Sequence, residues 1–157
     1  MRDALEAAHG KLKIQSVFLK DWRAGISADY DVQSDSLDSY TKQGFRNILS
    51  LNVEELDNDE SGSHTYKFIY GVGLRYVKES DEKADEKDIN PILLISAEFE
   101  ATYYSEAKLE DGEIDKFSEQ NVGFNVWPFW RELVQTSSTR FGLPVTISIP
   151  FYQSEDV

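Results

Sequence analysis

Apolar and polar residues alternate along much of this chain, and the two-residue period predicts β-strands. The clearest example is residues 65–77, TYKFIYGVGLRYV, and residues 46–56 and 93–103 alternate in the same way. Residues 12–22 carry apolar side chains on both faces, as expected for a strand that is covered on both sides. The charged run 78–88 is expected to be a solvated hairpin loop. Because a hairpin joins neighbouring strands, the four stretches predict an antiparallel sheet.

Two details of this pattern can be checked directly. The alternation within residues 46–56 predicts that Leu49, Leu51 and Val53 share one face. The polar stretch 23–45 is expected to be a connection with a short edge segment at 27–32. A connection of that length is unusual in a compact domain, which leaves open that the pattern conceals a strand.

Three- and four-residue spacing of apolar side chains follows the predicted sheet and indicates helices. A short helix is expected at 113–121, and a longer one has Asn125 as its N-cap, Pro128 in its first turn and Gly142 at its end. Its apolar stripe comprises Val126, Trp130, Leu133, Val134 and Phe141. Beyond the helix the chain is expected to run extended to Phe151. The sequence therefore predicts an α+β fold, a four-stranded antiparallel sheet with the C-terminal helix packed behind it.

Composition narrows the class of protein. The 157 residues predict a single domain, 1–157, with residues 1–10 as a flexible N-terminal segment. Sixteen Lys and Arg against 29 Asp and Glu give a net charge of −13, which disfavours nucleic acid and anionic membranes as partners. The chain has no cysteine, no apolar run long enough to span a membrane and no signal-peptide pattern. We therefore expect a cytoplasmic protein without membrane insertion.

Residues that often carry catalysis are few and scattered. His9 and His64 lie in a terminal segment and a turn, with no cysteine to accompany them as metal ligands. Glu98 and Glu100 share a strand face and could form an acid–base pair, but an exposed sheet face is the simpler explanation. The glycines of Gly71–Gly73 lie in mid-strand, unlike a phosphate-binding loop. The sequence predicts no active site, no metal and no cofactor.

Two separated motifs carry a resemblance to a known family. The predicted long helix has the pattern aromatic-Pro-aromatic-x-Arg-Glu, with Arg eight residues later and Pro four beyond (Trp127, Pro128, Phe129, Arg131, Glu132, Arg140 and Pro144). Residues 14–21, IQSVFLKD, are similar to the first-strand pattern Ile-Gln-x-Ile-Tyr-x-Lys-Asp. With the strand motif first along the chain and the helix motif second, the pair resembles the bacterial export chaperone SecB and its relatives. The resemblance covers most of residues 11–151. It implies a chaperone that holds unfolded polypeptides without ATP.

The resemblance also implies an oligomer. SecB is a tetramer, a dimer of dimers, in which helices from different protomers pack together. The interface is then expected on the long helix (Trp130, Arg131, Glu132, Leu133 and Val134). The aromatic content agrees, because 3 Trp, 8 Tyr and 9 Phe are more than one small core readily buries.

A holdase needs exposed apolar surface that is kept soluble by charge. We hypothesise that aromatic residues from the first and fourth strands and from the start of the helix form a client groove (Phe18, Trp22, Tyr103, Tyr104, Phe124 and Trp127). The alternative for each single residue is an ordinary place in the core.

The family also offers an acidic surface to the ATPase SecA. Asp21 matches the aspartate of the family's Lys-Asp pair, and Glu98 is the nearest counterpart of a second acidic residue if one gap is accepted. A third acidic position falls near Gly25 and is lost. The sequence also ends soon after Phe151, where the export chaperone continues into another helix. SecA is therefore a candidate partner that only part of the motif supports.

Three functions remain open at this point. The first is a holdase that hands exported preproteins to SecA. The second is a client-specific SecB-like chaperone that protects the antitoxin of a toxin–antitoxin pair. The third is an oligomeric interaction module without holdase activity, and an enzyme is a more distant alternative.

Overall fold

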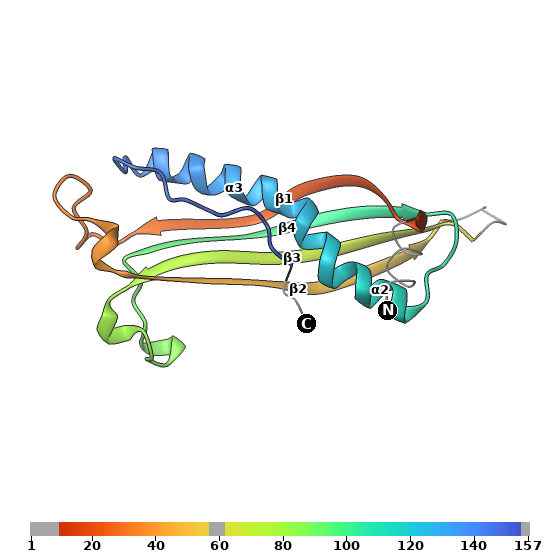
Figure 1. Ribbon diagram of the computed structural model, residues 1–157, viewed down its shortest axis with the longest axis horizontal. Helices are drawn as coiled ribbons and strands as arrows, with labels where there is room; N and C mark the ends of the chain where they lie inside the picture. The colour runs from red at the N-terminus through yellow and green to blue at the C-terminus, as the bar shows by residue number, and fades with distance from the viewer. Residues whose placement is uncertain (1–9, 57–61, 155–157) are drawn as a thin grey trace.

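The computed structural model describes residues 10–56 and 62–154, and it shows one antiparallel sheet crossed by a helix (Figure 1). The strands are β1 (Lys13–Ile26), β2 (Thr41–Glu55), β3 (His64–Val77) and β4 (Leu93–Ser105). They lie in the order β1-β4-β3-β2, and every neighbouring pair is antiparallel. The predicted fold class is confirmed. Residues 1–9 of the segment that was expected to be flexible, His9 among them, lie outside the described residues.

The strands reach further into the polar connection than the sequence pattern predicted. β1 continues to Ile26 and β2 already begins at Thr41, while residues 27–32, the expected edge segment, form no strand. The remaining connection contains a short 3-10 turn, η1 (Leu37–Ser39). Strand residues were missed because β1 and β2 are edge strands whose ends are largely exposed, so polar residues there do not alternate with apolar ones.

The expectation that Leu49 shares a face with Leu51 and Val53 is wrong. The register of β2 shifts between Ile48 and Ser50, and this bulge turns Leu49 onto the opposite face, where its side chain lies over Gly71. Leu51 keeps the predicted orientation opposite Phe68 of β3. An extra residue in one strand of a pair reverses the alternation locally, and this is what the sequence pattern did not reveal.

A continuous helical segment follows the sheet. It consists of α2 (Asp111–Phe117), a π-helical turn η4 (Ser118–Val122) and α3 (Gly123–Arg140), which crosses the sheet obliquely (Figure 1). The expectation of an N-cap at Asn125 is wrong, because Asn125 lies inside α3 and donates a hydrogen bond from Nδ2 to Tyr103 Oη at 2.8 Å. The helix instead starts at Glu110, where Glu110 and Glu113 form a capping box. Pro128 is accommodated inside the helix.

The end of α3 is as predicted. Gly142 has a φ of 73°, which favours glycine, and the N–H of Leu143 donates to the carbonyl of Ser138 at 3.2 Å. This six-residue closure satisfies a carbonyl that the helix leaves without an internal partner.

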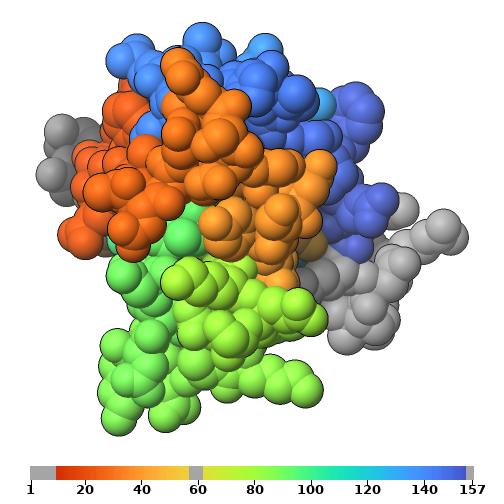
Figure 2. All heavy atoms as spheres, turned by 90° about the vertical axis from the view of Figure 1, so that its left-hand side faces the viewer, coloured from red at the N-terminus to blue at the C-terminus, as the bar shows by residue number. Residues whose placement is uncertain are grey.

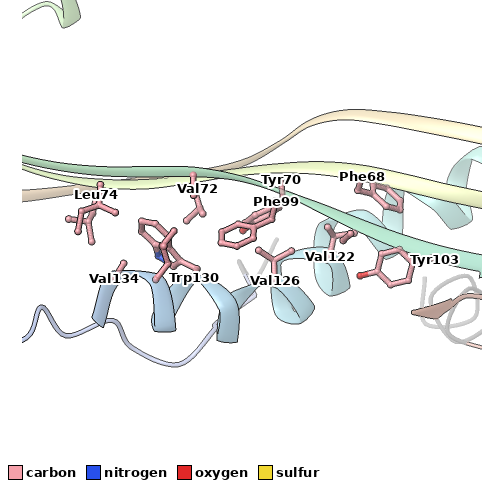
Figure 3. Packing of buried hydrophobic residues seen from close by; sticks show 14 of the residues in the cluster. Phe68, Tyr70, Val72, Leu74, Phe99, Tyr103, Val122, Val126, Trp130 and Val134 are labelled. Atoms are coloured by element: carbon pink, nitrogen blue, oxygen red, sulfur yellow. The ribbon is translucent and has the colours of Figure 1, made fainter. Parts of the chain in front are cut away.

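The core lies between the sheet and α3. Alternate residues of β3 and β4 point toward the helix and are buried, and Val126, Trp130 and Val134 of α3 point back toward them (Figure 3). The strand residues in this layer include Tyr66, Phe68, Tyr70, Val72, Leu74, Leu93, Ile95, Phe99 and Tyr103. The predicted apolar stripe of the helix is therefore confirmed as a core face.

On the opposite side of the sheet, called the outer face below, no helix of the described residues lies over the strands (Figure 1). It carries the other set of alternating residues, among them Gly71 and Gly73 of β3 and Glu98 and Glu100 of β4. The hairpin that joins β3 to β4 contains the 3-10 turns η2 (Glu79–Asp81) and η3 (Glu86–Asp88) and projects away from α3 at one end of the molecule (Figure 2).

Candidate peptide-binding surface

An extended segment, residues 144–154, leaves the end of α3 and returns along the helix toward the middle of the sheet (Figure 1). We call it the C-terminal tail. Side chains of α3 and β2 hold it through its backbone, because Trp127 Nε1 donates to the carbonyl of Pro150 at 2.7 Å and Arg131 Nε donates to that of Ile149 at 3.1 Å. From β2, Lys42 Nζ donates to the carbonyl of residue 148 at 2.9 Å, and Arg46 Nη2 to that of residue 153 at 2.7 Å. The tail thus bridges α3 and the edge strand β2.

Aromatic rings and guanidinium groups surround the far end of the tail. The Tyr152 ring packs edge-on against Trp127, with ring centroids 5.6 Å apart, and against Phe124 at 6.2 Å. The Arg46 guanidinium lies 4.7 Å from the centre of the Tyr152 ring, and that of Arg131 lies 4.4 Å from the Phe151 ring. Such cation–π contacts stabilise a partly exposed cluster by about 0.5–1 kcal/mol each. This cluster forms one wall of an apolar groove.

The groove is not completely filled. A hollow of about 520 Å³ remains between β2, α3 and the tail, and its walls include Leu74, Trp127, Trp130 and Phe151. Partial loss of water around the ammonium group lowers the pKa of Lys42, which lies at the edge of this hollow. The combination of apolar walls and backbone-directed donors suits an extended peptide.

A second apolar area lies on the outer face. Phe18 of β1 is 61% exposed, and Phe45 and Leu49 of β2 are 57% and 50% exposed. A shallow hollow of about 340 Å³ lies beside Phe45 and Leu49, over Gly71 of β3, and reaches Glu98 of β4. Large apolar side chains therefore stand exposed on both edge strands of the sheet.

The six aromatic residues predicted to form a client groove are not gathered in one place. Phe124 and Trp127 lie together around Tyr152 in the groove beside the tail. Phe18 and Tyr104 lie on the outer face, because their strand partners Glu100 and Thr65 face that side.

The other two lie elsewhere. Trp22 is 40% exposed on the helix side of β1, where it borders a hollow with Phe141 at the end of α3. Tyr103 is only 1% exposed, and burial raises its pKa to about 12, against the smaller opposite effect of the hydrogen bond from Asn125. Its ring is part of the core and is not available to a client, so we leave it out of the candidate surface.

The predicted SecA-binding residues do lie side by side. Asp21 of β1 is paired with Glu98 of β4 on the outer face. Basic groups accompany them, because Arg23 Nε is 3.8 Å from an Asp21 oxygen and Lys20 Nζ is 3.8 Å from a Glu100 oxygen. The acidic character of this area is therefore partly offset.

The residues predicted to form an oligomer interface point in different directions. Trp130, Leu133 and Val134 are buried against the sheet of their own protomer, because they form the core face of α3. This burial does not support the prediction that Trp130, Leu133 and Val134 contact another protomer. Arg131 binds the tail, and Glu132 is exposed and accepts a hydrogen bond from Thr136 Oγ1 at 2.6 Å.

Sequence reasoning did not identify several residues of this groove. Lys42 lies in the stretch 23–45 that was expected to be a connection, and Arg46 directly follows that stretch. The extended course of the tail to Phe151 was expected, but Tyr152 and the contacts of the tail with β2 and α3 were not. The signal that could have found them is the alternation Val145, Ile147, Ile149, Phe151, which is typical of an extended segment with one apolar side.

No cluster of metal-ligating side chains is present in the part of the chain that the structure describes. Within residues 10–56 and 62–154, no three His, Cys, Asp or Glu side chains gather as they would around a metal ion. Nor does any helix among the described residues have the length and apolarity needed to cross a membrane.

The described arrangement is similar to a solved chaperone structure. It matches the Mycobacterium tuberculosis Rv1957 SecB-like chaperone, solved in complex with a ChAD peptide from the Rv1956 HigA1 antitoxin, with a TM-score of 0.64 and 17% sequence identity over 96% of this chain and 99% of that chain. A protein of unknown function from Streptococcus agalactiae matches 88% of this chain and 98% of its own with a TM-score of 0.41 and 11% identity. No family model and no curated protein matches the sequence. The chain has the SecB-like fold, a four-stranded antiparallel sheet with its C-terminal helix packed across one face.

Proposed function

We propose that this protein is a chaperone that binds extended, non-native segments of a polypeptide without ATP. The observation that carries the proposal is the exposure of large apolar side chains along both edge strands, Phe18 and Trp22 on β1 and Phe45 and Leu49 on β2. Soluble monomers rarely leave so many large apolar residues in contact with water unless the surface binds something.

An unfolded client fits this surface for a physical reason. It offers apolar side chains at regular spacing but no fixed shape, so a long and shallow apolar surface binds it better than a deep pocket. The chain's net charge of −13 keeps such a surface soluble. Binding of this kind involves no catalytic step, and we place it in the cytoplasm.

We further propose that the client is a specific partner protein, such as the antitoxin of a toxin–antitoxin pair. The similar Rv1957 structure contains an antitoxin peptide, and this supports a client-specific chaperone over a general export chaperone. The proposal for this chain rests on the shared fold and on its own exposed apolar residues.

A homo-tetramer, built as a dimer of dimers, is part of the proposal. The outward side of α3 carries Phe129, which is 46% exposed, next to Glu132. This side of the helix, rather than the buried Trp130 stripe, is where we expect another protomer to pack. Light scattering on the purified protein measures the assembly.

The test of the chaperone is suppression of aggregation of a chemically denatured model protein, without nucleotide. We expect suppression by the wild type and its loss in the double variant Phe18→Ser/Phe45→Ser. The matched control, Gln15→Ser/Asn52→Ser, changes exposed polar residues on the same two strands and should suppress normally. A folded tetramer that never delays aggregation would instead indicate a passive interaction module.

A second candidate function is the transfer of exported preproteins to SecA. The observation that favours it is the pairing of Asp21 with Glu98 on the outer face. Binding of purified SecA should then weaken in Asp21→Asn/Glu98→Gln, with aggregation suppression unchanged. If SecA does not bind the wild type, the export function is ruled out while the chaperone proposal stands.

A further inference from the structure

The contacts that hold the C-terminal tail are directed at its backbone. Lys42 and Arg46 from β2, and Trp127 and Arg131 from α3, donate hydrogen bonds to four carbonyls between residues 148 and 153. Every residue of any polypeptide has a carbonyl group. A set of donors with this geometry therefore recognises an extended chain with little dependence on its sequence.

Side-chain sockets accompany these donors. Ile147 is 7% exposed, Ile149 packs partly buried against the core, and Tyr152 lies between the rings of Phe124 and Trp127. The floor under Tyr152 is Gly123, since a Cβ there would lie only 2.7 Å from the ring. A glycine at this point gives a large side chain room against the helix backbone.

The hold on the tail is limited. Val145 and Phe151 are each 77% exposed, and residues 146–154 belong to no helix or strand. Each side-chain hydrogen bond to a carbonyl contributes only a small net stabilisation, because water replaces it when it breaks. A segment held in this way can be exchanged for another extended segment without unfolding the sheet.

We propose that residues 146–153 are an intramolecular occupant of a peptide-binding groove between β2 and α3, and that an extended, apolar segment of the client displaces them. This inference rests on the proposed chaperone function. The tail then acts as an autoinhibitory strap. It covers the apolar groove until a client competes for it, and it lowers the apparent affinity for the client in proportion to the fraction of time that the groove is open.

The first experiment weakens the strap in the full chain. In Ile149→Ser/Tyr152→Ser two of the three inward side chains of the tail are lost, while Ile147 and the donors on β2 and α3 remain. We expect this variant to bind a fluorescein-labelled peptide of sequence PVTISIPFYQS, residues 144–154, about tenfold more tightly than the wild type by anisotropy. The control Val145→Ser/Ser154→Ala, at exposed ends of the tail, should bind as the wild type does.

Equal or weaker peptide binding by Ile149→Ser/Tyr152→Ser, with an unchanged circular dichroism spectrum, overturns the strap. If that variant is misfolded, a second measurement decides. The chain has no cysteine, so Gln153→Cys accepts a single bimane label, and because residue 153 and Trp127 line the same hollow we expect Trp127 to quench the label when the tail is docked. An unfolded, tryptophan-free client should raise the label's fluorescence, and binding without a rise contradicts displacement.

The two proposals can fail separately. Reduced, carboxymethylated α-lactalbumin, an unfolded protein, serves as the independent probe. If neither the wild type nor the variant binds it, the chaperone function is wrong. If both bind it equally well, the chaperone function stands and the strap is wrong.

Discussion

The ring of Phe45 lies over Gly73 on the outer face, across the pair of strands β2 and β3. A Cβ at Gly73 would lie 2.3 Å from the ring, so any larger residue there must push Phe45 aside. We expect Gly73→Ala to lower the free energy of unfolding by about 1 kcal/mol in urea titrations. The cost stays modest because Phe45 is already 57% exposed and its ring can swing into water.

The double variant Phe45→Ala/Gly73→Ala isolates this contact. With the ring gone, the two closest contacts of the new methyl group disappear and the Ile95 carbonyl remains at 3.2 Å. Alanine is intrinsically better than glycine in a strand by about 0.5–1 kcal/mol. Gly73→Ala should therefore cost less in the Phe45→Ala background than in the wild type. Strictly additive effects of the two substitutions would mean that the ring does not occupy this place.

Two adjacent serines of α3 make a matched pair for testing how the tail is anchored. Both are buried, and both donate back to the helix, Ser137 to the Leu133 carbonyl and Ser138 to the Val134 carbonyl. Ser138 Oγ alone also accepts a hydrogen bond, from the backbone N–H of Ile147 at 3.1 Å. Ser138→Ala should therefore cost about 1–3 kcal/mol of unfolding free energy, because a buried donor loses its partner.

Ser137→Ala serves as the control, since it removes only a hydroxyl that bonds within the helix. We expect less than about 0.5 kcal/mol there, because alanine is the better helix former. Limited chymotrypsin cleavage near Phe151 should accelerate in Ser138→Ala only. Equal effects of the two substitutions would argue against an anchor at Ile147.

Two glycines near the ends of the helical segment, Gly112 and Gly142, should respond to alanine in opposite directions. Gly142 has a φ of 73° at the end of α3, whereas Gly112 lies exposed in α2. Gly142→Ala should lower the unfolding free energy by about 1 kcal/mol, because a Cβ is strained in that conformation. Gly112→Ala should raise it by about 0.5–1 kcal/mol, since alanine favours the helix. Thermal unfolding of both variants measures the difference, and the same sign for both would contradict the assigned helix end.

The sequence was most informative where one side of an element is buried. β3 and β4 lie in the middle of the sheet, so their alternation was complete, and the stripe of Val126, Trp130 and Val134 revealed the core face of α3. At the edges this signal is lost. The bulge that turns Leu49 over follows from pairing with β3, which no local pattern of residues specifies.

The candidate site was harder to predict than the fold. The aromatic residues were all visible in the sequence, but their faces depend on register and bulges, which separate Phe18 from Trp22. Asparagine is a common N-cap residue, yet the side chain of Asn125 donates its hydrogen bond to the buried hydroxyl of Tyr103 instead. The groove beside the tail depends on contacts between residues about a hundred positions apart, such as Arg46 with residue 153.

The buried hydroxyl of Tyr103 should make the free energy of unfolding depend on pH in the alkaline range. Burial raises the pKa of Tyr103 to about 12 in the folded protein, from an ordinary value of 10.0. Below pH 10 the hydroxyl is protonated in both the folded and the unfolded chain, and its contribution to stability does not change. Above that value the unfolded chain releases the proton while the folded chain keeps it, so stability is lost as pH rises toward about 12.

The difference in unfolding free energy between the wild type and Tyr103→Phe isolates this effect, because other groups titrate alike in both proteins. We expect the difference to be constant below about pH 9 and then to fall by on the order of 1 kcal/mol per pH unit. Removing the hydroxyl also deprives Asn125 of its acceptor, which adds a constant cost at every pH. Urea titrations between about pH 9 and about pH 11.5 measure the slope. A difference that stays flat over this range would mean that the Tyr103 hydroxyl reaches water, and that its ring lies nearer the surface than the core packing against Phe68 and Phe117 requires.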